Sequence, residues 1–200
     1  MEEILRKIKA DFRANMNGVA SAHMRESGLS YHVNFGIELP RLQEIAKEVR
    51  AEIAASDAPR LSGQSGISGK ASLPKVAQQL WMENVRESKI MAAMLMPTEY
   101  FTPELADLWA EQIPNAEIAQ TTTLYLFTRL PYASSLIFPW LASERELLQL
   151  CGLLLATRMI IQGKVFNEDS MAELVDQAHS LLDSPNLHVR KAAQNLVARI

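Results

Sequence analysis

Apolar residues recur at helical spacing along most of the chain, and the pattern requires no strand. Leu147, Leu150 and Leu154 stand at i, i+3 and i+7, which places them on one face of a helix. The stretch 147–161 is apolar nearly all round, so we expect it in the middle of a stack with helices on both sides. The spacing predicts ten helices, near 2–26, 39–56, 73–83, 86–96, 103–113, 115–129, 131–141, 144–162, 168–183 and 187–199.

Several residue patterns mark where these helices begin. Thr102-Pro103-Glu104 combines an N-cap, a proline at the first helical position and an early acid, all of which favour a helix start. Ser143-x-x-Glu146 and Ser170-x-x-Glu173 have the pattern of capping boxes, in which a hydroxyl and a carboxylate satisfy the free backbone N–H groups. These signals support the helices predicted near 103, 144 and 168.

The later helices of several predicted pairs share an Ala-rich pattern, seen at 85–95 and again at 188–196. Small residues let one helix press against its neighbour, and about five pairs of roughly forty residues can be laid over the chain. We therefore predict an all-α, HEAT-like or ARM-like helical repeat superhelix (α-α solenoid) forming a single domain over 1–200. The second helix of each pair should line a concave face, with Ala92 and Ala193 buried at helix contacts.

Composition fits a soluble protein with a continuous core. Hydrophobic residues make up 48% of the 200 residues, which argues against disorder for the bulk of the chain. The single cysteine, Cys151, excludes an internal disulfide and stands in an apolar run, as a buried inert thiol would. No apolar stretch is long enough to span a membrane and the N-terminus lacks a secretory layout, so we expect a cytoplasmic protein.

One segment is of low complexity, the Ser/Gly-rich stretch near 60–72. Its Gly69-Lys70 pair resembles part of a phosphate-binding loop, but Gln64 and Ala71 stand where that motif needs Gly and Ser or Thr. We therefore predict a flexible loop between helices and the first site of limited proteolysis, not a nucleotide site.

Charge is unevenly distributed. Residues 102–147 hold six acidic and two basic side chains, whereas 148–200 hold five of each. Because Lys and Arg supply most of the non-specific affinity for nucleic acid, the middle of the chain is a poor surface for a duplex.

Candidate chemistry is sparse. The four histidines have no companions at ligand spacing, so neither a metal nor another cofactor is predicted. Glu87 stands between Arg86 and Lys89 and is either a catalytic carboxylate or, the favoured interpretation, part of an ion pair. The tryptophans fall on apolar helix faces, where a core role is favoured over ligand stacking; they are Trp81, Trp109 and Trp140.

Three stretches in order resemble the AlkD-like family of DNA alkylation repair proteins. They are 33–47 (VNFGIELPRLQEIAK), Leu80-Trp81 followed by Arg86-Glu87 and Ala92-Ala93, and 189–193 (VRKAA). The resemblance extends over most of the chain and implies HEAT-like helical repeats that curve around DNA. In active members, it implies an Asp in a Trp-Asp-x-x-Asp run that stabilises the positive sugar formed as an alkylated base departs.

The resemblance also locates the family's site in this sequence, and the functional residue types are missing there. The catalytic Asp becomes Gln120 and the Trp of its run becomes Ala116, while a functional Arg becomes Leu150 and a second Trp becomes Asn195. Gln120 carries no charge and cannot supply the same electrostatic stabilisation. Glu117 remains at the first acid of the run, a weak catalytic candidate, because each helical step turns a side chain by about 100°.

We accordingly expect a non-catalytic relative of the family that binds DNA or another protein in a concave groove. An alkylpurine DNA glycosylase with a site rearranged around Glu117, and a protein–protein interaction scaffold, are the alternatives. No membrane association is expected, and the sequence carries no prediction of oligomeric state. Candidate phosphate contacts are Lys89, Arg158, Arg190 and Lys191.

Overall fold

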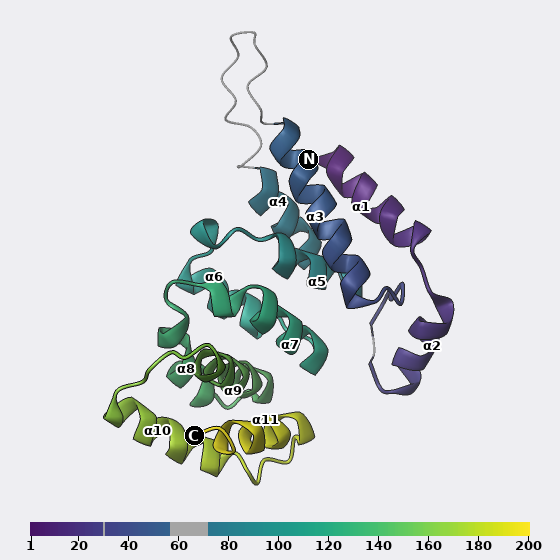
Figure 1. Ribbon diagram of the computed structural model, residues 1–200. Helices are drawn as coiled ribbons and strands as arrows, with labels where there is room; N and C mark the ends of the chain where they lie inside the picture. The colour runs from purple at the N-terminus through teal and green to yellow at the C-terminus, as the bar shows by residue number, and fades with distance from the viewer. Residues whose placement is uncertain (30, 57–71) are drawn as a thin grey trace, which may run out of the picture. The chain divides into compact units, whose positions relative to one another are not determined.

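The computed structural model describes residues 1–29, 31–56 and 72–200, and within these ranges the chain is all-α, as predicted (Figure 1). The described residues contain no strand, only an isolated parallel bridge between Val33 and Val85. They form two compact units, Met1–Tyr100 and Phe101–Ile200. The single domain and its superhelical course remain predictions, and the Ser/Gly-rich segment predicted to be flexible falls outside the described residues.

The first unit is built around α5, whose ten residues are all buried. Helices α3 and α4 both pack on α5, and Ala92 lies fully buried there, as predicted. The elements of this unit are α1 (Glu2–Ala14), α2 (Gly18–Glu26), α3 (Leu39–Ser56), α4 (Ser72–Trp81), α5 (Arg86–Leu95) and the 3-10 helix η1 (Thr98–Tyr100).

The prediction of one helix over 2–26 was wrong, because the chain breaks at 15–17. Asn17 begins α2 as its N-cap, with its side chain accepting a hydrogen bond from the backbone N–H of Ala20. The backbone N–H of Asn17 donates to the carbonyl of Phe35 at 2.8 Å, so it is not available to continue α1. A distant backbone contact and a side-chain cap thus outweigh local helical spacing.

The second unit is built around α9, which contacts α6, α7, α8 and α11. This confirms the central position predicted from its apolar composition, and Ala193 of α11 is fully buried, as expected. The elements are α6 (Pro103–Glu111), α7 (Ala116–Tyr125), the 3-10 helix η2 (Phe127–Arg129), α8 (Ala133–Leu141), α9 (Glu146–Ile161), α10 (Glu168–Ser180) and α11 (Leu187–Val197).

In the second unit, helices begin after asparagine N-caps more often than at the predicted capping boxes. Thr102 caps α6 as predicted, accepting from Leu105 N. Both capping boxes were wrong, because α9 begins after Arg145 and α10 begins at Glu168, which leaves Ser170 inside the first turn. Asparagine side chains accept from backbone N–H groups at three of these starts, which are well suited to Asn; the caps are Asn115, Asn167 and Asn186.

Helices α8 and α9 approach closely at Gly152. A Cβ at this position would lie 3.0 Å from Leu141 Cγ and 3.1 Å from the carbonyl oxygen of Ile137. Protein interiors are close-packed, so the missing side chain is what lets the two helices meet at this distance.

Aromatic side chains fill the rest of this core. Phe127 packs edge-on against Trp140 with ring centroids 4.9 Å apart, and Phe101 packs in the same way against Trp109. The indole N–H of Trp140 donates to Asp107 at 2.8 Å, which satisfies its one polar atom. All three tryptophans of the chain are at most 2% exposed, so the core interpretation of these residues is confirmed. No helix among the described residues is long and apolar enough to cross a membrane.

Candidate functional site

The four positions at which the resemblance places the family's site, Ala116, Gln120, Leu150 and Asn195, lie in the second unit, on α7, α9 and α11. Helix α9 contacts both α7 and α11, so the structure brings these positions onto neighbouring helices. Their exposure differs: Gln120 and Asn195 are exposed, whereas Ala116 and Leu150 are buried, Leu150 with 1% of its surface accessible. Of the four, only Gln120 and Asn195 therefore have side chains that are open to solvent.

Helices α7, α9 and α11 run in the same direction, as the links between their ends show. Asn186, the N-cap of α11, donates from its amide to Glu146 at the start of α9. Arg145, the N-cap of α9, donates to the carbonyl of Glu111, the last residue of α6, from which a short connection leads to the start of α7. The three N-terminal ends therefore form one edge of the unit, the N-terminal edge, and the segments that follow α7 and α9 form the opposite, C-terminal edge.

Exposed or half-buried residues recur at helical spacing along one side of each of these helices, and they define what we call the outer face. On α9 they recur at intervals of seven, four and three residues, so they share one side of the helix. The outer face consists of Glu117, Gln120 and Leu124 on α7, Leu147, Leu154, Arg158 and Ile161 on α9, and Leu187, His188, Lys191, Gln194 and Asn195 on α11. Its ionisable side chains are one carboxylate, one guanidinium, one ammonium and one imidazole group.

The carboxylate of the outer face belongs to Glu117, in the first turn of α7. This residue is half-buried, and its backbone carbonyl accepts a hydrogen bond from the hydroxyl of Thr121. Gln120, three residues later, is exposed and presents a neutral amide. An amide can orient a ligand through hydrogen bonds but cannot offset a full positive charge as a carboxylate does.

The four predicted phosphate contacts have different environments. Arg158 and Lys191 are exposed on the outer face. Arg190 donates from Nη1 to the carbonyl of Ser184 at 2.6 Å, and so stabilises the connection between α10 and α11. Lys89 lies in the first unit, where its ammonium donates to the carbonyl of Trp81 at 2.8 Å and stands 4.5 Å from the centre of that indole ring.

Lys89 is directed inward by these contacts. Only 9% of its surface is accessible, and burial lowers the pKa of its ammonium group below the ordinary value. Its hydrogen-bond and cation–π partners are both supplied by Trp81. Among the four predicted residues, Arg158 and Lys191 therefore have the exposure that a phosphate contact needs.

Glu87 is fully buried, and its ion-pair interpretation is confirmed. Its carboxylate accepts hydrogen bonds from Arg86 Nη1 at 3.0 Å, from the backbone N–H of Phe35 at 3.1 Å and from that of Ile37 at 3.2 Å. Arg86 also donates to the carbonyl of Ile37 at 2.8 Å. The pair therefore holds the segment 33–37 against the start of α5 and is not open to a substrate.

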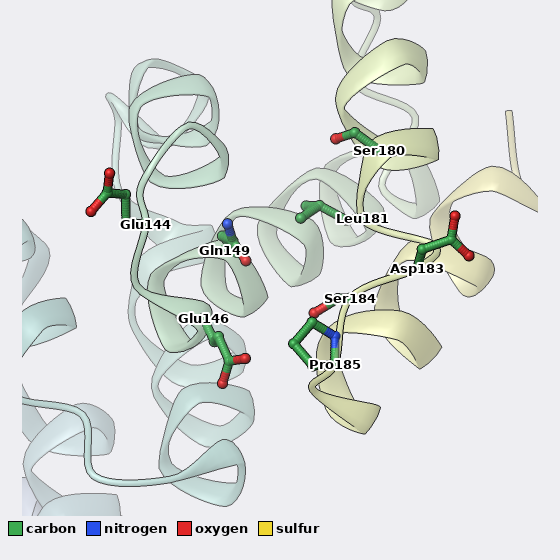
Figure 2. A pocket seen from close by; sticks show the side chains of 8 residues that line it. All are labelled: Glu144, Glu146, Gln149, Ser180, Leu181, Asp183, Ser184 and Pro185. Atoms are coloured by element: carbon green, nitrogen blue, oxygen red, sulfur yellow. The ribbon is translucent and has the colours of Figure 1, made fainter.

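A pocket of about 400 Å³ lies at the N-terminal edge, between the start of α9 and the connection from α10 to α11. Figure 2 shows the carboxylates of Glu144 and Asp183 on opposite sides of this acidic pocket, pointing away from each other. Glu146 is engaged by Asn186. The carboxylates do not converge, and the described residues contain no group of three or more His, Cys, Asp or Glu able to hold a metal. The lining residues are Glu144, Glu146, Gln149, Ser180, Leu181, Asp183, Ser184 and Pro185.

A second pocket, of about 520 Å³, lies at the C-terminal edge, and we call it the basic pocket. Arg129 follows α7 and Lys164 follows α9, and none of the lining residues is acidic. Sequence reasoning missed both cations, because they are far apart in the chain and stand in segments without net positive charge. The lining residues are Thr128, Arg129, Leu130, Pro131, Ala133, Ser134, Met159, Gln162, Lys164 and Val165.

Comparison with known proteins adds one finding. A family model described as DNA alkylation repair enzyme matches residues 8–198 and therefore covers both units almost entirely. Comparison with curated proteins and with solved structures gave no significant match.

Proposed function

Because the chain belongs to the DNA alkylation repair enzyme family, we propose that it is a non-catalytic member that binds nucleic acid on the outer face of its second unit. One observation carries the proposal: the exposed side chain of Gln120 is a neutral amide at the position where the resemblance places the charge-stabilising Asp. The rest of the site agrees with this. Ala116 and Asn195 offer no aromatic ring to a lesion, and Leu150 is buried and apolar.

Loss of catalysis follows from the chemistry of base release. As the base departs, positive charge develops on the sugar, and preorganised groups that oppose this charge supply much of the rate enhancement. Losing one such group typically costs about 100- to 1,000-fold in rate. Here several groups are replaced together, and such losses reinforce one another when the groups act as a unit.

The experiment on catalysis is release of an alkylated base from purine-methylated duplex DNA by the purified protein. We expect release at least about 100-fold slower than that of an active family member assayed in parallel. Glu117→Gln is the companion variant and should change nothing, because Glu117 has no catalytic role in this proposal. Robust release that is abolished in Glu117→Gln would overturn the proposal and support the glycosylase alternative, which rests on the half-buried carboxylate of Glu117 beside Gln120.

Binding is supported by Arg158 and Lys191, exposed cations on two neighbouring helices. Each phosphate that a cation neutralises releases counterions, which steepens the dependence of affinity on salt by about 0.9 per contact. Duplex affinity measured by fluorescence anisotropy between about 50 and about 200 mM salt should therefore fall steeply. Arg158→Gln and Lys191→Gln should each reduce the slope by about one.

The matched control for binding is Lys75→Gln, which removes an exposed cation of α4 in the first unit and should leave the slope unchanged. The protein-scaffold alternative is favoured by the charge of the second unit, which carries seven basic and eleven acidic side chains. Absence of any salt-dependent duplex binding would contradict the nucleic-acid role and leave the scaffold as the better explanation.

A further inference from the structure

The basic pocket combines two cations that come from separate elements. Arg129 closes η2, directly after α7, whereas Lys164 follows the end of α9. Both are exposed, and Arg129 makes one hydrogen bond, from Nη1 to the carbonyl of Tyr125 at 3.0 Å. Within the described part of the chain, neither side chain takes part in an ion pair, and the Lys164 ammonium makes no hydrogen bond. The pocket therefore concentrates positive charge that no carboxylate among the described residues neutralises.

The end of α9 positions Lys164 in this pocket. Gly163 adopts a left-handed φ of +74° and donates to the carbonyl of Ile160, and the backbone N–H of Lys164 donates to that of Met159. This pair of hydrogen bonds is a Schellman motif, in which the residue in the place of Lys164 commonly makes an apolar contact with the residue in the place of Met159. Here that place holds a lysine, and both residues line the pocket.

A role in stabilising helix ends accounts for Arg129 but not for Lys164. Cations near a helix C-terminus interact favourably with the helix dipole, and Arg129 does so by donating to the carbonyl of Tyr125, the last residue of α7. Lys164 lies beyond the left-handed residue, and its side chain donates to no carbonyl of α9. Ser134, in the first turn of α8, adds the positive end of a second helix dipole to the pocket wall.

The rest of the pocket suits the uncharged part of a ligand. Leu130, Ala133 and Met159 are buried and give it an apolar floor, while Gln162 supplies an exposed amide. A volume of about 520 Å³ falls within the range of about 300–1,000 Å³ typical of small-molecule sites.

We propose that the basic pocket binds a phosphate-bearing ligand of nucleotide size, with its phosphate between Arg129 and Lys164 and its ring system against Leu130 and Met159. A free nucleoside monophosphate and one nucleotide of a bound strand share this chemistry. The strand as a source rests on the proposed nucleic-acid function, whereas the free nucleotide does not. Either ligand would occupy a site at the C-terminal edge, separate from the positions on the outer face.

The experiment titrates AMP, adenosine, inorganic phosphate and a short single-stranded oligonucleotide into the full chain, by calorimetry or by NMR. We expect AMP or the oligonucleotide to bind roughly tenfold or more tightly than adenosine, because hydrogen bonds to charged groups are the stronger ones. The double variant Arg129→Gln/Lys164→Gln should lose roughly tenfold or more of that affinity. Lys75→Gln is the matched control, and an unchanged urea midpoint shows that the double variant is folded.

The outcomes separate the two sources and the two proposals. AMP binding lost in the double variant supports the free nucleotide, whereas oligonucleotide binding alone, lost in the same way, supports the strand. Measurable binding of AMP and adenosine with equal affinity, no loss of affinity in the double variant, or binding of neither AMP nor the oligonucleotide would overturn the inference. The proposed function is tested by a different measurement, the salt dependence of duplex DNA affinity in Arg158→Gln and Lys191→Gln. Its failure can therefore be told apart from failure of this inference.

Discussion

The centres of the two units are stabilised by different kinds of interaction. In the first, the segment 33–37 is fixed by hydrogen bonds from every side, to Glu87 and Arg86 on α5 and to Asn17 at the start of α2. In the second, α9 is surrounded by apolar contacts, and its close approach to α8 depends on the absent side chain of Gly152. One centre is polar and directional, and the other is apolar and shaped by size.

This difference predicts how each centre responds to substitution. A buried polar network needs every partner, because a group left without its hydrogen bond retains the full cost of its desolvation. An apolar core loses stability in proportion to the volume changed, and nearby side chains share the adjustment. Conservative changes should therefore be costly near Glu87 and graded around α9.

The largest effect is expected for Glu87→Ala. The change leaves the guanidinium of Arg86 buried without its counter-ion and removes the acceptor of two backbone N–H groups. Breaking a buried ion pair in this way typically costs about 3–5 kcal/mol, and urea denaturation would measure it as a loss in the free energy of unfolding. The control is Glu44→Ala, which removes an exposed partner of Arg41 and should change stability by less than about 1 kcal/mol. Similar losses for the two variants would mean that the polar centre is no more demanding than the surface.

Gly36→Ala should have the next largest effect, about 3 kcal/mol. Gly36 adopts a φ of +71°, and a Cβ there would lie 2.2 Å from the backbone oxygen of Asn17. A left-handed conformation alone costs a non-glycine residue about 1–2 kcal/mol, and here a clash with backbone atoms is added. Gly28→Ala is the matched control, because Gly28 has a φ of +86° but no atom within 4 Å of the added Cβ. Equal losses of stability in the two variants would show that the backbone around the segment 33–37 can shift to accommodate the extra methyl group.

A smaller effect is expected in the apolar centre. Ala193→Leu enlarges a fully buried residue of α11, a helix that contacts α9, and overpacking of this kind typically costs about 1–3 kcal/mol. Gln194→Leu, at the exposed neighbouring position, should change the unfolding free energy by at most about 0.5 kcal/mol. An unchanged denaturant midpoint for Ala193→Leu would mean that the contact between α9 and α11 is looser than the structure indicates.

The smallest effect on stability is expected for Cys151. It is absent at neutral pH and appears only in alkaline solution. Burial raises the pKa of this thiol to about 12, whereas the unfolded chain should titrate near the ordinary value of about 8.5. The folded state holds its proton over this window, so the contribution is fully present below about pH 8.5 and is lost as pH rises towards 12. The free energy of unfolding should fall by up to about 1.4 kcal/mol per pH unit there. Cys151→Ala should flatten this part of the profile, and an equal slope in both proteins would contradict the assignment.

Much of the fold could be predicted because helical spacing is a local signal. The central place of α9 followed from its apolar circumference, and the helix start at Thr102 followed from its cap and proline. The break at 15–17 could not be predicted, because it depends on Phe35, distant in sequence, accepting the backbone N–H of Asn17. The asparagine N-caps of α7, α10 and α11 are local signals too, because Asn is among the residues preferred at this position.

The candidate site was less predictable, because exposure depends on tertiary packing. The resemblance located Gln120 and Leu150 along the chain, but only the packing of α9 shows that Leu150 is buried while Gln120 is exposed. Lys89 likewise has the residue type of a phosphate contact, yet it lies against Trp81. The basic pocket left no sequence pattern, since Arg129 and Lys164 come together only through the parallel course of α7 and α9.

The contact between Lys89 and Trp81 also gives the first unit an optical signature. Trp81 is the single tryptophan of that unit and lies beside the Lys89 ammonium group, whereas Trp109 and Trp140 belong to the second unit. Replacing Trp81 by phenylalanine removes the tryptophan fluorescence of the first unit, and replacing Trp109 and Trp140 removes that of the second. Intrinsic fluorescence can therefore record the melting of each unit separately, without an added dye or a cut in the chain.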